Sequence, residues 1–565
     1  MIFYIPFLAA ILAGLCFRRG IKVVSALSAV GSGILIFESL TRIPDIDGLS
    51  RFFAFLVGVG GLAVSVYSIG YMKPRHLVPV AFPTFLLSMA YIPLARNFAT
   101  MLIFWEIMTI SSYVLVMAEY ESEKTRNAGM LYLLTMQGLN SVPLLLAFGY
   151  IYHVAGTLKF NMLMGISLPT WVLFLMFLGF ATKGGIFPLH FWLPEAHPVA
   201  PSNASALLSG VMLKMAVYGM LRSIEVFNGW ESLAVPIVVL STLTIMVGSL
   251  LALGQNNIKR MMAYSSVDNL GYIFLAIGSY LLLDGELRYL ALAGALLHSF
   301  NHMTFKGLLF MLSGNIMKAT GRGDFGIRGL GENMKVTEGL SLVGILSISG
   351  IPPTNGFVSK LLIYMATLSS GIPMLVIAGA VALLGSTLTL AAYVKFYRLF
   401  TGTGSKVEEA PLPMLAGELF LGALCILSAV FPNALLSPAG VRIDVPVSSS
   451  VIASGFALLL GVIAFSILPK KGMKSAPWTT GEDVPPELFE IRPEHMVGEF
   501  SKPVFLFQMA GKRSVMFLRR VWEAYSSIGF EHPDWVFISI LSRGIYGLAC
   551  LVKESVGVVF WKFSR

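Results

Sequence analysis

Apolar runs long enough to cross a lipid bilayer recur along the whole chain. A transmembrane helix needs about 20 predominantly apolar residues, and residues 52–72, 233–254, 373–394 and 451–468 are clear examples. Of the 565 residues, 56% are hydrophobic and only 12% are charged, whereas soluble domains have about 25% charged residues. The sequence therefore predicts one large helical bundle in a membrane and excludes a series of soluble domains.

We expect an all-α integral membrane protein with about 14–16 transmembrane helices, counted as apolar runs of bilayer length. The expected spans lie near residues 2–17, 21–40, 51–72, 77–95, 99–118, 127–154, 169–192, 202–222, 232–254, 265–283, 288–316, 339–369, 373–400, 413–432 and 448–468, with a last one near 534–561.

Basic residues lie at the ends of the apolar runs, so the net charge of +10 does not indicate a nucleic-acid partner. Lys and Arg are concentrated in the loops after odd-numbered spans. The positive-inside rule then places these loops in the cytoplasm and the N-terminus outside the cell membrane. Cys16, Cys425 and Cys550 have neither metal-site nor disulfide spacing, and we expect no cofactor or metal in this chain.

Several ionisable residues lie well inside expected spans, where a lipid-facing charge costs about 3 kcal/mol or more. We regard them as functional candidates: Glu106, Lys183, Lys214, His298, His302, Lys306 and Lys360. The alternative is that such side chains lie near helix ends and reach the lipid headgroups. We accept that alternative for Lys259 and Arg260, at the start of the tenth span.

His298, His302 and Lys306 are four residues apart and share one helical face. Two histidines at this spacing can bind zinc, but no carboxylate or thiol is placed to complete a site. A proton relay fits better, because histidine titrates near neutrality and a buried lysine loses its proton more readily. A nearby carboxylate, for which Glu106 is the candidate, would favour the protonated lysine.

Glycine and proline interrupt the seventh span at residues 183–188 and the twelfth at 350–356. Broken helices at corresponding places in two halves are typical of transporters built from inverted repeats. The breaks are five spans apart, which predicts two inverted five-helix repeats, each with a broken helix and a lysine beside the break. The expected organisation is helices 1–3 in residues 1–76, the repeats in 77–222 and 232–400, helices 14 and 15 in 401–468, a cytoplasmic loop in 469–499, an amphipathic lateral helix along the membrane interface in 500–530, and a final transmembrane helix in 531–565.

Residues 190–210 resemble the antiporter-like ion-pumping subunits shared by respiratory complex I, Mrp-type cation/proton antiporters and group 4 membrane-bound hydrogenases. Residues 259–266, 301–307 and 350–360 carry the same resemblance. It implies that Glu106 and Lys183 form a charge pair, that Lys214 connects to a relay of His298, His302 and Lys306, and that Lys360 is the terminal carrier. The chain departs from the family pattern at Asn257, Asn269 and Leu361.

Residues 477–482 look most like the hydrogenase-type branch. We therefore expect an H⁺- or Na⁺-translocating subunit of a ferredoxin-linked hydrogenase or sulfur-reducing complex. The chain has no cysteine-rich cluster motif, so iron–sulfur clusters and redox chemistry are expected in partner subunits, both membrane and peripheral. A subunit of an Mrp-type Na⁺/H⁺ antiporter or of quinone-linked complex I remains the alternative. A purely structural scaffold would have no use for intramembrane lysines.

Overall fold

The computed structural model describes residues 2–443, apart from residues 17–19, 42–45, 74, 76 and 403–405. The spans expected near 448–468 and 534–561, the loop at 469–499 and the lateral helix at 500–530 lie outside the described residues.

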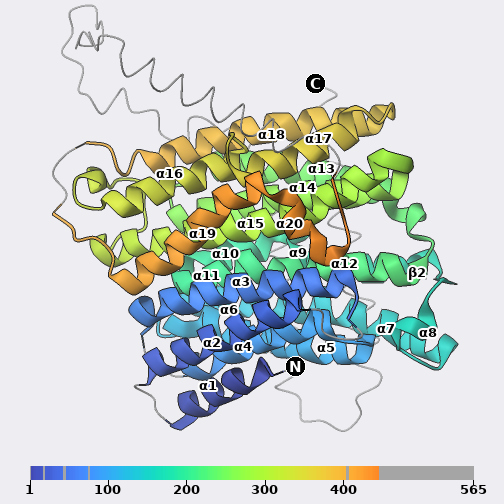
Figure 1. Ribbon diagram of the computed structural model, residues 1–565, viewed down its shortest axis with the longest axis horizontal. Helices are drawn as coiled ribbons and strands as arrows, with labels where there is room; N and C mark the ends of the chain where they lie inside the picture. Colours follow the sequence, from blue (N-terminus) through green and yellow to red (C-terminus); the bar gives the residue numbers. More distant parts are fainter. Residues whose placement is uncertain are drawn as a thin grey trace, which may run out of the picture.

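The described chain is a bundle of helices with one short two-stranded parallel sheet (Figure 1). Its first half consists of α1 (Tyr4–Cys16), α2 (Ile21–Leu40), α3 (Gly48–Tyr71), α4 (Val78–Leu94), α5 (Phe98–Val116), η1 (Met117–Glu119), α6 (Glu123–Thr135), η2 (Met136–Ser141), α7 (Val142–Ala155), α8 (Phe160–Leu163), β1 (Ile166–Ser167), α9 (Thr170–Gly184), η3 (Leu189–Trp192), α10 (Leu193–Val199), α11 (Ser202–Leu207), η4 (Leu208–Met212), α12 (Leu213–Val226), β2 (Phe227–Asn228) and η5 (Trp230–Leu233).

The second half consists of α13 (Ala234–Leu253), α14 (Ile258–Leu282), α15 (Gly285–Thr320), η6 (Leu330–Glu332), α16 (Lys335–Ser349), α17 (Asn355–Leu368), α18 (Pro373–Tyr397), α19 (Leu412–Val430), α20 (Pro432–Leu436) and η7 (Ser437–Ala439). The segments η2 and η4 are π-helices inside longer helical spans.

The all-α membrane fold is confirmed. Within the described ranges, nine helices are long and apolar enough to cross a membrane, and α1 and α4 are shorter apolar helices. The helices α14 and α15 have 25 and 36 residues but bury many polar side chains. In Figure 1, α14 and α15 lie between α1–α4 on one side of the bundle and α16–α18 on the opposite side.

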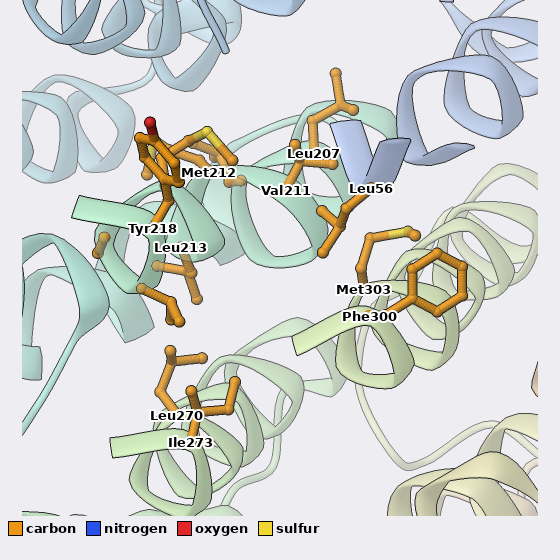
Figure 2. Packing of buried hydrophobic residues seen from close by; sticks show 14 of the residues in the cluster. Leu56, Leu207, Val211, Met212, Leu213, Tyr218, Leu270, Ile273, Phe300 and Met303 are labelled. Atoms are coloured by element: carbon orange, nitrogen blue, oxygen red, sulfur yellow. The ribbon is translucent and has the colours of Figure 1, made fainter. Parts of the chain in front are cut away.

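The segment from α11 to α12 is enclosed on all sides, with its whole apolar window buried. Figure 2 shows Val211 and Tyr218 of this segment in a cluster that includes Leu56 of α3, Leu270 of α14 and Met303 of α15. A helix that is apolar all round is typically a buried one. Lys214, in the middle of this segment, therefore has no path to the lipid.

Both expected helix breaks are confirmed. The helix α9 ends before Gly185 at φ 69°, and α16 ends before Gly350 at φ 72°. Glycine adopts this left-handed conformation without the steric cost that other residues have. The amide after each glycine donates to the carbonyl five residues earlier. Ile186 donates to Ala181 at 3.0 Å, and Ile351 donates to Leu346 at 2.9 Å.

The starts of α5 and α14 also correspond. Asn97 and Asn257 are the N-caps of these helices and accept hydrogen bonds from the backbone amides of Thr100 and Arg260. Asn97 forms an isolated antiparallel bridge with Lys159, and Asn257 forms one with Asp324. Such paired features are what repeats of spans 4–8 and 9–13 predict, and both the repeats and their inversion stay predictions.

Candidate functional site

The lysines and histidines selected from the sequence are buried. Lys183, Lys214, His298, His302 and Lys306 are 0% exposed and Lys360 is 2% exposed, so none of them reaches the lipid headgroups. Glu106 is only partly buried. Each buried polar side chain must find a partner inside the protein, because an unsatisfied one costs about 1–3 kcal/mol.

Lys183 lies in the last turn of α9, two residues before the left-handed Gly185. Its ammonium donates to the Thr109 hydroxyl at 2.6 Å and lies 4.8 Å from the centre of the Trp105 ring. Glu106 lies on α5 one turn before Thr109, and its carboxylate accepts from Gln137 Nε2 at 3.1 Å. The described residues therefore contain no direct Glu106–Lys183 ion pair, although the Glu106 charge still acts on Lys183 through space.

The π-helix η2 supplies polar groups to the two helices that flank this lysine, α5 and α9. Gln137 bonds to Glu106, and Asn140 accepts from Trp105 Nε1 at 2.8 Å and donates to the Gly179 carbonyl at 2.7 Å. A π-helical turn is rare and is frequent at functional sites. The wider turn in η2 thus connects α5 to α9 beside Lys183.

Lys214 joins the two halves of the chain. Its ammonium donates to the Ser209 carbonyl at 2.6 Å, which belongs to the π-helix η4, and it contacts His302 Nδ1 on α15. The family resemblance implies that Lys214 connects to the relay of His298, His302 and Lys306, and the structure brings Lys214 into direct contact with His302. No hydrogen bond in the described part of the chain connects Lys214 to Lys183.

His298 and His302 lie on one face of α15 with ring centroids 6.3 Å apart. The ring nitrogens of His298 contact Ser359 Oγ at 2.9 Å and Asn269 Oδ1 at 3.2 Å. Asn269, one of the positions at which the chain departs from the expected pattern, therefore still touches the relay. Among the described residues, no group of three His, Cys, Asp or Glu side chains is placed to hold a metal ion.

Lys306, on α15, extends its side chain between α14 and α18. It donates to the Met262 carbonyl at 2.7 Å, to the Ser265 hydroxyl, and to the Tyr393 hydroxyl at 3.2 Å. Within the described ranges, the acceptors of this ammonium are all uncharged oxygens.

Lys360 lies on α17, just after the break in the twelfth span. It donates to the Ile348 carbonyl at 3.0 Å, at the end of the preceding half-helix α16, and to Ser386 Oγ at 2.9 Å. The Tyr272 ring lies 4.5 Å from its nitrogen. A helix C-terminus carries partial negative charge, so the break itself stabilises the ammonium.

Two buried carboxylates are not among the candidates expected from the sequence: Asp268 on α14 and Glu418 on α19, both 0% exposed. The signal was present, since both lie inside expected spans. The tenth span was expected to start at residue 265, which placed Asp268 at a helix end. The structure starts α14 at Ile258, so Asp268 lies about three turns inside the helix.

The expectation that Lys259 reaches the headgroups is wrong. Its side chain is 3% exposed, and its ammonium donates to the Ala200 carbonyl at 2.7 Å. That carbonyl follows the end of α10, where the chain offers an acceptor inside the protein. Arg260 behaves differently and pairs with Glu195 at 3.0 Å near the surface.

Residues 95–389, about half of the chain, match the family described as NADH:quinone oxidoreductase/Mrp antiporter, transmembrane. Hydrogenase-4 component B of Escherichia coli (strain K12) is 32% identical over 77% of this chain and 69% of its own length. A Na⁺/H⁺ antiporter subunit of Alkalihalophilus pseudofirmus is 32% identical over 72% of this chain, which spans 56% of that relative.

Among solved structures, a chain of the membrane-bound sulfane sulfur reductase, an archaeal respiratory membrane complex, has the same fold. It aligns with a TM-score of 0.78 at 23% identity, over 97% of this chain and 99% of the other. These relatives are subunits of multi-subunit membrane complexes.

Proposed function

Because this chain belongs to the NADH:quinone oxidoreductase/Mrp antiporter transmembrane family, we propose that it translocates protons as a subunit of a ferredoxin-linked hydrogenase or sulfur-reducing complex. The observation that carries the proposal is the enclosed row of nitrogen bases Lys183, Lys214, His302, His298, Lys306 and Lys360. Intramembrane ionisable groups of this kind mark proton relays and ion pathways.

In this mechanism the lysines alternate between the ammonium and amine forms. Glu106 favours the ammonium form of Lys183 through its charge. The contact between Lys214 and His302 passes a proton between the two halves of the chain, and Lys360 releases it at the second helix break. Electron transfer, and the iron–sulfur clusters that perform it, belong to partner subunits.

The chemistry of the row favours H⁺ over Na⁺ as the ion that moves along it. Sodium, a hard cation, is best held by oxygen ligands, whereas a lysine or histidine nitrogen exchanges protons. The nearest groups to Lys306 are hydroxyls and a carbonyl already engaged by its ammonium.

The hydrogenase-like assignment rests on hydrogenase-4 component B, of which the chain covers 69%. The likeness to the Na⁺/H⁺ antiporter protein of Alkalihalophilus pseudofirmus favours an Mrp-type complex as the second candidate. Affinity purification through this chain separates the two. Hydrogenase-like and iron–sulfur subunits in the purified complex support the first, and small antiporter subunits without them support the second.

Transport is tested with the intact complex in sealed vesicles. Proton uptake is followed with a pH-sensitive dye, and sodium uptake with a radioactive tracer, after addition of reduced ferredoxin or of a sodium gradient. We expect ferredoxin-driven proton uptake that Lys183→Ala abolishes while the complex stays assembled. The matched control Lys124→Ala, an exposed lysine on α6, should transport normally. Normal transport by Lys183→Ala would contradict the mechanism.

A further inference from the structure

The row of nitrogen bases has a gap between Lys306 and Lys360. Neither lysine contacts the other by a hydrogen bond in the described part of the chain. Lys306 is bonded to Met262, Ser265 and Tyr393, and Lys360 to Ile348 and Ser386. A proton passing from one to the other needs an intermediate group.

The polar face of α18 bridges this gap. Ser386, Thr389 and Tyr393 are three and four residues apart, so they lie along one side of the helix. Ser386 accepts from Lys360 at 2.9 Å, and Tyr393 accepts from Lys306 at 3.2 Å. Between them, the Thr389 hydroxyl donates to Asp268 Oδ2 at 2.8 Å.

The facing helix α14 also has a contact with each lysine and a polar residue between the two contacts. Ser265 accepts from Lys306, and the Tyr272 ring lies beside Lys360. Asp268 is one turn after Ser265 and one turn before Tyr272 on the same helical face. Both helices therefore place the Asp268 carboxylate between the two lysines.

One oxygen of the Asp268 carboxylate is available to accept a proton. Asp268 Oδ2 accepts from Thr389 and from Asn269 Nδ2 at 3.3 Å, whereas Oδ1 is buried and has no partner among the described residues. Gly385 faces this oxygen, since a Cβ atom built there would lie 3.6 Å from Oδ1 and 3.1 Å from the Tyr272 hydroxyl. Lys360 and Lys306 lie close enough for their charges to act on Asp268.

We propose that Asp268 carries the proton between Lys306 and Lys360, an inference that rests on the proposed function. The Lys306 ammonium gives a proton to the Asp268 carboxylate, which leaves a neutral amine and a neutral carboxylic acid. The acid then gives the proton to the neutral Lys360 amine and returns to the carboxylate. Neither step changes the net charge of the buried cluster, which avoids the cost of an uncompensated charge in a low dielectric.

Other titratable groups face the same space without replacing this carboxylate. Tyr272, Tyr364 and Tyr393 contribute hydroxyls to Ser386 or Ser265, and His298 reaches Asn269, the residue next to Asp268. Tyrosine keeps its proton near neutral pH. Asp268 is therefore the group between the two lysines that can both accept and return a proton.

The test is proton transport per turnover by the assembled complex in vesicles. Asp268→Asn keeps the size and an acceptor for Thr389 but cannot take up a proton, and it should lower transport at least tenfold. Asp268→Glu restores the carboxylate and should recover part of it. Ser279→Ala removes a buried α14 hydroxyl that donates to the Leu275 carbonyl of its own helix, and this variant should transport normally.

The outcomes separate this inference from the proposed function. Normal transport by Asp268→Asn, in a complex that Lys360→Ala inactivates, would overturn the role of Asp268 alone. Normal transport by both variants would overturn the proposed function as well. If Asp268→Asn does not assemble, Thr389→Val decides. This variant keeps the charge of Asp268 but removes the hydroxyl that donates to its ionised carboxylate. The pH of half-maximal transport should therefore move to a higher value. An unchanged pH profile would overturn the inference.

Discussion

The ammonium of Lys183 bonds to the hydroxyl of Thr109 at 2.6 Å. Thr109 lies one turn after Glu106 on α5, and the Glu106 carboxylate is bonded to Gln137 instead. The hydroxyl thus occupies the position at the ammonium that an ion pair would give to the carboxylate. Two neighbouring groups on one helix act on Lys183 in different ways, one by a hydrogen bond and the other by charge.

Thr109→Val should impair transport without unfolding the chain. Valine has the shape of threonine but leaves the buried ammonium without its acceptor, a loss of about 1–3 kcal/mol. This favours neutral Lys183, and we expect proton uptake in vesicles to fall about tenfold. Thr109→Ser keeps the hydroxyl and should retain most of the activity. Equal transport by the valine and serine variants would contradict the role of this hydrogen bond.

Glu106→Gln should lower transport per turnover sharply, because it removes the charge and keeps the shape. The amide can still bond to Gln137, so a loss of transport would report the charge and not the packing. Glu106→Asp keeps the charge on a shorter side chain and should retain part of the activity. Glu123→Gln, at an exposed glutamate of α6, is the control. A Gln variant that pumps like wild type would exclude Glu106 as the charge partner of Lys183.

Substitutions at Lys214 and His302 should be strongly non-additive in stability, because the two side chains are in contact. We expect Lys214→Met and His302→Gln to show a coupling of about 0.5–3 kcal/mol in a double-mutant cycle, measured by unfolding in detergent. His302→Gln combined with Lys183→Met is the control, since those side chains do not touch. That pair should add within about 0.5 kcal/mol, and additivity at Lys214 and His302 would argue against their contact.

Gly356→Ala should destabilise the second helix break. A Cβ atom at this position would lie 1.7 Å from the Ser347 carbonyl oxygen, so α16 and α17 would have to separate. Forced overpacking typically costs about 1–3 kcal/mol, which should appear as a lower melting temperature of the purified chain. Gly339→Ala, in α16 with nothing within 4 Å of the position that its new methyl group would take, should leave the melting temperature equal or higher.

Asp47 should make the fold sensitive to acid. It caps α3 from the loop before it, and the Arg222 guanidinium donates to both of its oxygens at 2.7 Å. Burial raises the pKa of Asp47, but the Arg222 charge and hydrogen bonds outweigh it and hold the pKa below 3.8. The stabilisation is therefore complete above about pH 4 and is lost as the pH falls through the lowered pKa.

Asp47→Asn should remove this acid-dependent contribution and lower stability near neutral pH by about 1 kcal/mol, because the Asp47 side chain is 47% exposed and solvent screens the pair. The measurement is the melting temperature of variant and wild type between about pH 3 and about pH 7. The two curves should converge at the acid end. Curves that stay parallel over the whole range would show that Asp47 is not the titrating group.

Much of the site could be predicted from the sequence because the bilayer penalises charge. The interior position of Lys183 and Lys360 in their expected spans and the nearby Gly and Pro residues mark both as candidates, and the structure buries both beside confirmed breaks. The sequence could not predict that Lys183 bonds to the Thr109 hydroxyl and not to the Glu106 carboxylate. These two groups are one turn apart on the same helix, and sequence spacing does not show which of them contacts the ammonium.

The sequence by itself determined the membrane class, the approximate spans, the helix breaks and most of the ionisable residues, because these follow from local hydrophobicity and from the backbone chemistry of glycine and proline. Only the tertiary structure decided which of those residues meet. The π-helical turn beside Lys183 depends on how α5 and α9 pack. The contact of Lys214, the buried acceptor for Lys259 and the position of Asp268 between two lysines depend on how α14, α15 and α18 pack. Such contacts join residues far apart in the chain, and no local pattern encodes their geometry.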